Sequence, residues 1–156
     1  MYNYTYRNSS IDLWQLSMYY IYGSMVGLCN VIFTVAVLAL AVAKWETSGL
    51  VLRCACLLGC LIFTVFQPLT IYRKARKQAK AITEDTEISF HTGGVHVKVG
   101  KAVSDMKWSQ IKRVSKKPTM IVVFTDTTHG YVLTNRVIGK DREQLYAYIT
   151  SRMKRT

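Results

Sequence analysis

Two long uncharged stretches dominate the pattern of apolar and polar positions along the 156-residue chain. No residue from Leu13 to Ala43 carries a full charge, and the same holds from Cys54 to Tyr72. Each stretch is long enough to cross a hydrocarbon core of roughly 30 Å, which takes about 20 helical residues. A short polar segment, from Lys44 to Gly49, lies between them. The pattern therefore predicts an antiparallel hairpin of two transmembrane helices.

An aromatic segment precedes the hairpin. Tyr2, Tyr4 and Tyr6 alternate with polar residues, and this period of two predicts a short strand. One strand has no partner of its own, so it either docks on a later domain or stays loose. Residues 12–22 are rich in Tyr and Trp and amphipathic. They form either a helix lying in the membrane interface or the first turns of one long tilted helix.

Small residues recur four positions apart in both predicted spans. Gly23 and Gly27 form one such pair, and Ala55 and Gly59 form the other. This spacing lets helix backbones approach closely in lipid, either within the hairpin or in a homodimer.

Two amides and one proline interrupt the apolar spans. Counted from the turn at 1.5 Å per residue, Asn30 and Gln67 both lie at a depth of roughly 20 Å. We predict that they form an interhelical hydrogen bond that sets the register of the hairpin, because a lone amide in hydrocarbon is costly. Pro68 is expected to kink the second helix near its exit.

Basic residues follow the second span immediately and set its orientation. The chain carries a formal net charge of +12. Five basic residues without an acidic one stand within eight positions: Arg73, Lys74, Arg76, Lys77 and Lys80. By the positive-inside rule, the C-terminus lies on the cytoplasmic side of the cell membrane. With two spans, the N-terminus lies on the same side. We expect these residues to contact anionic lipid headgroups.

From Glu87 the apolar period changes to two, which indicates strands separated by glycine-containing turns. The last strands flank a turn at residues 126–130, and the chain ends in an amphipathic helix from about Lys140 to Met153. We predict an α+β membrane protein in three regions. Residues 1–22 hold the strand and aromatic helix, 23–81 the hairpin and a basic stalk, and 82–156 a small antiparallel roll of pleckstrin-homology-like form. Its expected core includes Phe90, Trp108, Ile111 and Val114.

Candidate chemistry is sparse. The four cysteines lie in the apolar windows, and His91, His96 and His129 are scattered over predicted strands and a turn. None has the spacing of a metal site, and no catalytic or phosphate-loop motif is present, so we expect no metal, no cofactor and no enzymatic activity. Trp108 is either a ligand platform or, the interpretation we favour, a core anchor.

A second group of basic residues lies in the predicted roll: Lys112, Arg113, Lys116 and Lys117. This group either holds the roll against an anionic membrane or is a solvated face. No recognised nucleic-acid-binding pattern accompanies it, so we expect no nucleic acid partner.

Three motifs resemble those of a known family: Ile88 to Phe90, Gly94 to Val97, and Trp108 to Val114 with its Trp-x-x-Ile-x-x-Val order. They resemble the YcxB-like bacterial membrane proteins, and the resemblance extends over nearly the whole chain. It implies two N-terminal spans and a cytoplasmic C-terminal domain related to pleckstrin-homology folds.

Three functions are compatible with this organisation. The first is a non-enzymatic membrane protein whose roll binds a protein partner or a second copy of itself. The second is a sensor of anionic lipid, and the third is a small immunity or stress-protection protein. A transporter is the least favoured, because two spans with only two interior amides offer no pathway.

Overall fold

The structure is a computed structural model that describes residues 1–47, 49–127 and 129–154. Ser48 and Thr128, which belong to two of the expected turns, lie outside the described residues. The chain divides into two compact units. One comprises Met1–Asn8 together with Ile82–Thr156, and the other comprises Ser9–Ala81. The first strand therefore groups with the C-terminal roll, whereas the aromatic helix groups with the hairpin.

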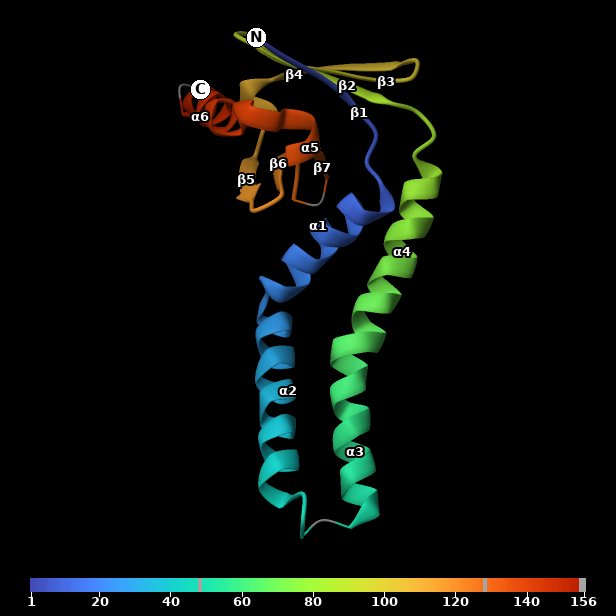
Figure 1. The fold of residues 1–156 in the computed structure, drawn as a ribbon. Coiled ribbons are helices and arrows are strands. Elements are labelled where there is room, and N and C mark those ends of the chain that lie inside the picture. Colours follow the sequence, from blue (N-terminus) through green and yellow to red (C-terminus); the bar gives the residue numbers. More distant parts are fainter. Residues whose placement is uncertain (48, 128, 155–156) are drawn as a thin grey trace. The chain divides into compact units, whose positions relative to one another are not determined.

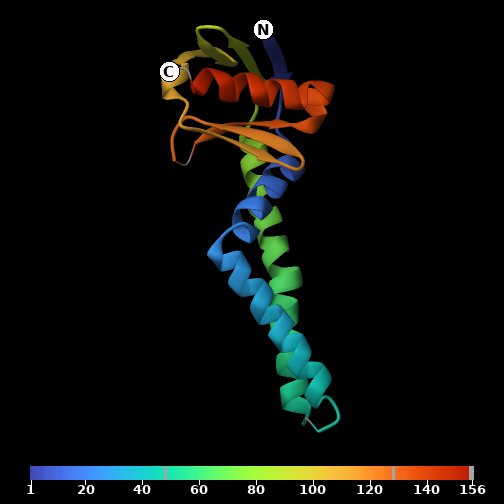
Figure 2. The same cartoon turned by 90° about the vertical axis from the view of Figure 1, so that its left-hand side faces the viewer.

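The helical unit is a hairpin preceded by one further helix (Figure 1). Its elements are α1 Ser10–Tyr22, α2 Met25–Lys44, α3 Leu50–Leu61, the π-helical segment η1 Ile62–Phe66, and α4 Gln67–Ala81. Elements α3, η1 and α4 follow one another without a gap and form one long helix that α2 packs against (Figure 2). Two stretches, Met25–Lys44 and Leu50–Ala81, are long and apolar enough to cross a membrane.

A sharp break separates α1 from α2. At the start of α1, the Ser9 hydroxyl accepts a bond from the Asp12 N–H, and the Asp12 carboxylate accepts one from the Ser9 N–H, which is a capping box. The helix ends where the Gly23 N–H donates to the Tyr19 carbonyl at 3.1 Å, and the Ser24 hydroxyl then caps α2. Of the two alternatives for residues 12–22, the structure takes the separate helix, because caps satisfy the backbone on both sides of the break.

The hairpin is closed by a narrow seam. In α2 the less exposed positions alternate at spacings of three and four: Gly27, Asn30, Thr34, Val37 and Ala41. The facing helix repeats this spacing at Arg53, Cys56, Cys60, Phe63 and Gln67. Such spacing is that of a coiled-coil seam, which covers only a small part of each helix surface. Large apolar side chains on the other faces therefore stay exposed, for example Val42 at 82% and Leu57 at 55%.

The second unit is a roll of two antiparallel sheets. The first sheet has the order β1-β2-β3-β4 and the second the order β5-β6-β7. Their bounds are β1 Tyr2–Tyr6, β2 Thr86–His91, β3 Gly94–Val99, β4 Ala102–Lys107, β5 Arg113–Lys117, β6 Met120–Phe124 and β7 Gly130–Thr134. Short turns η2 Trp108–Gln110, α5 Asn135–Ile138 and η3 Gly139–Asp141 lead to the final helix α6 Arg142–Met153. The predicted α+β class, strands followed by one C-terminal helix, is confirmed.

The N-terminal strand completes the first sheet. Tyr4 lies opposite Ile88 in an antiparallel register, and Tyr2 lies opposite Phe90. The Tyr6 side chain is buried in the core of the roll. The strand thus docks on the later domain, and it adds a seventh strand to the about six that the C-terminal pattern alone predicts.

The core of the roll forms between the sheets and α6. Phe90 and Ile111 are buried there, Val114 packs against them while half-buried, and Leu145 of α6 is fully buried. Trp108 anchors this core, because its indole N–H donates to the carbonyls of two successive residues, His91 and Thr92, at 3.1 Å each. Its ring also stacks on Phe90 with centroids 6.4 Å apart. The indole is thus held by packing and hydrogen bonds inside the domain.

Candidate functional site

The two amides that the residue count places at equal depth meet in the hairpin seam. The Asn30 side-chain amide donates to the Gln67 side-chain oxygen at 3.0 Å. Thr34 donates its hydroxyl to the Asn30 backbone carbonyl at 2.8 Å, within α2. Both amides are half-buried in an apolar seam, where water is scarce. The bond between them gives each side chain a polar partner and so avoids the cost of an unpaired amide.

The small residues do not pack the hairpin as their spacing suggests. Gly27 is buried, but a Cβ there would meet the backbone of Ile21 and Tyr22, so this glycine closes the corner between α1 and α2. Gly23 forms the C-cap of α1, and Ala55 is exposed. Only Gly59 faces the partner helix, where a Cβ would lie 3.8 Å from the Phe33 ring. The packing role predicted within the hairpin for Gly23, Gly27 and Ala55 is therefore wrong, because spacing alone does not say which neighbour a small residue meets.

Pro68 is accommodated by a change of helix type. Lacking an N–H, Pro68 leaves the Thr64 carbonyl without its α-helical donor. The segment Ile62–Phe66, which ends two positions before Pro68, is π-helical, and the Gln67 N–H donates to the Ile62 carbonyl. Such π segments widen a helix locally and occur frequently at functional positions.

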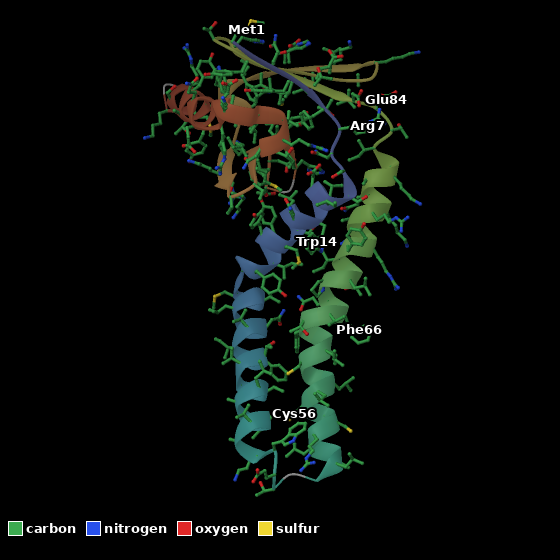
Figure 3. The ribbon with its side chains drawn as sticks, viewed as in Figure 1. Met1, Arg7, Trp14, Cys56, Phe66 and Glu84 are labelled. Atoms are coloured by element: carbon green, nitrogen blue, oxygen red, sulfur yellow. The ribbon has the colours of Figure 1, made fainter. Side chains whose placement is uncertain are left out.

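A groove of about 520 Å³ lies beside this irregular region, where α1 packs on the long helix. The Trp14 indole N–H donates to the Pro68 carbonyl at 3.2 Å, and its ring meets the Tyr72 ring edge-on with centroids 6.5 Å apart. Val65 and Leu69 supply apolar walls. Figure 3 shows the Trp14 side chain in the region between α1 and α4. The groove is open, and every residue that lines it is uncharged.

The basic residues of α4 all point away from its packed side. Ala75 is only 1% exposed and faces inward, which lets α1 and α4 approach closely. The exposed positions around it are the predicted headgroup contacts: Arg73, Lys74, Arg76, Lys77 and Lys80. Geometry thus leaves these five side chains available to an anionic surface.

The second basic group does not form a single patch. The Lys116 ammonium bonds the Glu143 carboxylate at 2.5 Å and lies over the Tyr146 ring, both on α6. This hydrogen bond lowers the pKa of Glu143 below its usual value. Side chains alternate along β5, so Arg113 lies on the other face, over the Phe124 ring at 4.5 Å. Lys112, Arg113, Lys116 and Lys117 therefore do not share one surface, and of the two alternatives for this group only a part of it, Lys112 and Arg113, is left to approach a membrane.

Lys112 and Arg113 remain exposed beside one hollow of the roll. This hollow has a volume of about 430 Å³ and is lined by these two residues together with Asp126 and Thr127. The carboxylate of Asp126 partly offsets the two positive charges at short range. Lys117 is half-buried, and its backbone carbonyl accepts a bond from Arg142.

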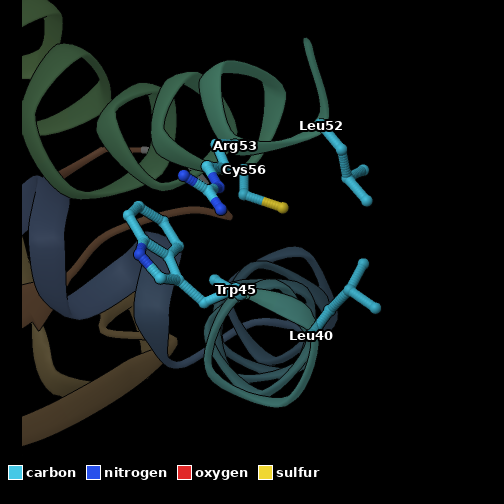
Figure 4. A pocket seen from close by; sticks show the side chains of 6 residues that line it. Leu40, Trp45, Leu52, Arg53 and Cys56 are labelled. Carbon is cyan, nitrogen blue, oxygen red and sulfur yellow. The ribbon is translucent and has the colours of Figure 1, made fainter. Parts of the chain in front are cut away.

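At the turn of the hairpin, one cation lies among apolar residues (Figure 4). The Arg53 guanidinium is 5.2 Å from the centre of the Trp45 ring, a cation–π contact. A small hollow beside them, lined also by Leu40, Leu52 and Cys56, has a volume of about 10 Å³. That is about the space of one water molecule, so this hollow is too small for a larger ligand.

The histidines lie apart from one another. His96 bonds Asp105 across β3 and β4, and this places it on the polar face, since Val95 and Val97 on either side of it are buried. His129 bonds Asp126 within one turn, whereas His91 faces the Gly94 carbonyl. Across residues 1–47, 49–127 and 129–154, His, Cys, Asp and Glu form no group of three or more that could hold a metal ion.

Strand β4 forms an open edge of the first sheet. It pairs with β3 and, among the described strands, with no other. Five of its six residues are exposed, and Val103 presents an apolar side chain at 56% exposure. An edge of this kind carries backbone groups that are available to another strand.

These features define a class of protein: an apolar helical hairpin joined to an antiparallel α+β roll that its N-terminal strand completes. Residues 90–149 match the family model described as YcxB-like protein. The resemblance predicted from the motifs is thus confirmed for the roll, from the end of β2 to α6, whereas the match does not extend to the hairpin. No curated protein matches the chain.

Proposed function

We propose that the chain is a non-enzymatic integral membrane protein that presents its roll at the cytoplasmic face for interaction with another protein or with a second copy of itself. The observation that carries the membrane placement is the exposure of the hairpin. Large apolar side chains such as Val35, Leu38 and Leu58 are more than half exposed along both helices. Leaving them in water costs about 25 cal/mol per Å² of apolar surface, whereas lipid removes that cost.

The position of the first strand supports the predicted topology. Strand β1 precedes the hairpin in the chain, β2 follows it, and the two strands pair. Both ends of the hairpin must therefore be on one side of any membrane that it crosses, as two crossings require. The five basic residues after the second crossing support the cytoplasm as that side.

The open edge of β4 is the surface that, in this proposal, binds the partner protein or the second copy. Main-chain groups of an edge strand supply affinity to an added strand, and exposed side chains such as Val103 supply selectivity. Asp105 and Lys107 flank this edge with both signs of charge, which disfavours indiscriminate pairing.

Photo-crosslinking in membranes tests this function. A benzophenone-bearing residue in place of Val103, in the full-length protein, should give one crosslinked species of defined mass, either a dimer or a single partner. The substitution Val103→Lys should abolish association of two differently tagged copies, or of the partner so identified. Ser109→Lys, an exposed position off the edge, serves as the matched control. Crosslinks to lipid alone, or equal association in both variants, would rule out β4 as the interaction surface.

A lipid sensor is the second candidate, and the observation that favours it is the exposure of Lys112 and Arg113 side by side. Replacing both with Ser should weaken the approach of the roll to anionic lipid by about 2 kcal/mol. Fluorescence transfer from the roll to labelled phosphatidylglycerol, with the full-length protein in nanodiscs, measures that approach. An unchanged transfer efficiency in the double variant would eliminate this candidate.

A further inference from the structure

The groove beside Pro68 has the chemistry of a binding site for a single lipid. Its walls are apolar at Val65 and Leu69 and aromatic at Trp14 and Tyr72. Its volume of about 520 Å³ falls within the roughly 300–1,000 Å³ of small-molecule sites. The bond from the Trp14 indole to the Pro68 carbonyl fixes one wall, so the groove is built into the contact between α1 and the long helix.

Two rows of side chains connect this groove to the basic stalk. Residues four apart on a helix lie one above the other, so Pro68, Tyr72 and Arg76 form one row of α4. Leu69 and Arg73 form the neighbouring row. Each arginine Cα is about 6 Å further along the axis than the groove residue before it. The guanidinium groups of both rows are therefore within reach of a headgroup whose chain occupies the groove.

The order of side chains along η1 and α4 matches the order of a bilayer leaflet. Apolar side chains come first at Val65 and Leu69, an aromatic ring follows at Tyr72, and cations follow at Arg73 and Arg76. Hydrocarbon, interface and headgroup succeed one another in the same way, with Tyr and Trp at the interface level. The acidic residue nearest the groove on α1, Asp12, is engaged with the backbone and hydroxyl of Ser9 at the helix cap.

We infer that this groove binds one anionic phospholipid, with an acyl chain against Val65 and Leu69 and the phosphate on Arg73 and Arg76. Charge complementarity selects the anionic class, because the first charged residue that each row reaches beyond the groove is an arginine, and guanidinium groups bind phosphate oxygens in a bidentate manner. The inference rests on the membrane placement proposed above. It adds a defined site, distinct from a general attraction of the stalk to the surface.

Native mass spectrometry of the full-length protein, released from nanodiscs, tests the site. The probes are palmitoyl-oleoyl phosphatidylglycerol and phosphatidylcholine with the same chains. The wild type should retain one phosphatidylglycerol in preference to phosphatidylcholine. Replacing Arg73 and Arg76 together with Ser should lower this preference by about 30-fold, since each basic contact contributes about fivefold.

Two tryptophan substitutions separate the groove from the surrounding lipid. Leu69→Trp obstructs the wall of the groove that the acyl chain would contact and should weaken retention of both lipids, whereas Leu57→Trp, on an exposed face of α3, should retain them as the wild type does. Equal retention in the two tryptophan variants, or an undiminished preference in the arginine variant, would overturn the site. Flotation with vesicles is measured in parallel. If no variant floats, the membrane placement fails; if all float and retain lipid equally, only the groove fails.

Discussion

The amide pair in the hairpin seam allows a quantitative test of the hairpin. Asn30→Leu, Gln67→Leu and the double variant form a thermodynamic cycle around the 3.0 Å bond between the two side chains. Each single substitution leaves one amide without its partner in an apolar seam, which costs about 1–3 kcal/mol. The double substitution leaves no unpaired amide there, so its cost should be smaller than the sum of the two single costs.

The expected coupling follows from the geometry. A neutral amide bond of this length contributes about 0.5–1.5 kcal/mol net, and interhelical bonds measured in membranes average about 0.6 kcal/mol. We therefore predict a coupling free energy of about 1 kcal/mol. The measurement is an SDS titration of the full-length protein in mixed micelles. Its signal is energy transfer between two fluorophores, one at the start of α2 and one at the end of α4, which are the helix ends furthest from the turn.

Additive losses would refute the reasoning, because they would show that the two amides do not interact in the folded hairpin. Thr34→Val serves as the control, since it removes a bond within α2 and leaves the interhelical one in place. Its cost should add independently to that of Gln67→Leu.

Further predictions concern the corner of the helices and the first strand. Gly27→Ala should destabilise the helical unit by about 1–3 kcal/mol in the same titration, because its Cβ would meet the Ile21 carbonyl, whereas Gly59→Ala should be neutral or stabilising by up to about 1 kcal/mol. Equal effects of the two alanines would contradict this assignment. Burial raises the pKa of Tyr4 to about 12 and raises the pKa of Tyr6 further. In the folded protein both side chains therefore stay protonated at pH values at which tyrosine in the unfolded chain ionises. Their contribution to the free energy of unfolding of the roll should be complete below about pH 10 and should be lost as the pH rises through 12. Thermal unfolding followed by near-UV circular dichroism measures this loss, and Tyr6→Phe should make it smaller. A loss of stability as steep as in the wild type would contradict the role assigned to Tyr6.

The helices and the class of the roll could be predicted because their causes are local. Charge-free windows of sufficient length specify apolar helices, and a period of two specifies strands. The pairing of the amides also followed, since Asn30 and Gln67 lie about the same number of residues from the turn on two helices whose rise per residue is fixed. The break at Ser24 could not be decided from composition, because it depends on a single hydroxyl that caps α2.

Features that depend on distant neighbours were beyond the sequence. The residues of β2 that pair with the first strand lie 80 to 88 positions further along the chain. Residues Trp108 to Gln110 form a 3-10 turn in which the indole reaches the carbonyls of His91 and Thr92, which precede it by 17 and 16 residues. Spacing could not identify the neighbour of Gly27 for the same reason.

Some of the site was readable and was missed. Alternation along β5 separates Lys116 from Arg113 and so excludes one common patch. The four-residue rows that lead from Pro68 and Leu69 to the arginines are likewise present in the sequence. What the sequence does not reveal is the contact between Trp14 and Pro68, which depends on how α1 packs against α4.

The central claim is that the hairpin crosses a membrane twice and leaves both ends of the chain in the cytoplasm. Paired reporters test it most directly, with a fluorescent protein or alkaline phosphatase placed either at the C-terminus or in the turn after Thr47. The account predicts fluorescence without phosphatase activity at the C-terminus, and phosphatase activity without fluorescence in the turn. Phosphatase activity at the C-terminus, or a protein recovered in the soluble fraction, would contradict it.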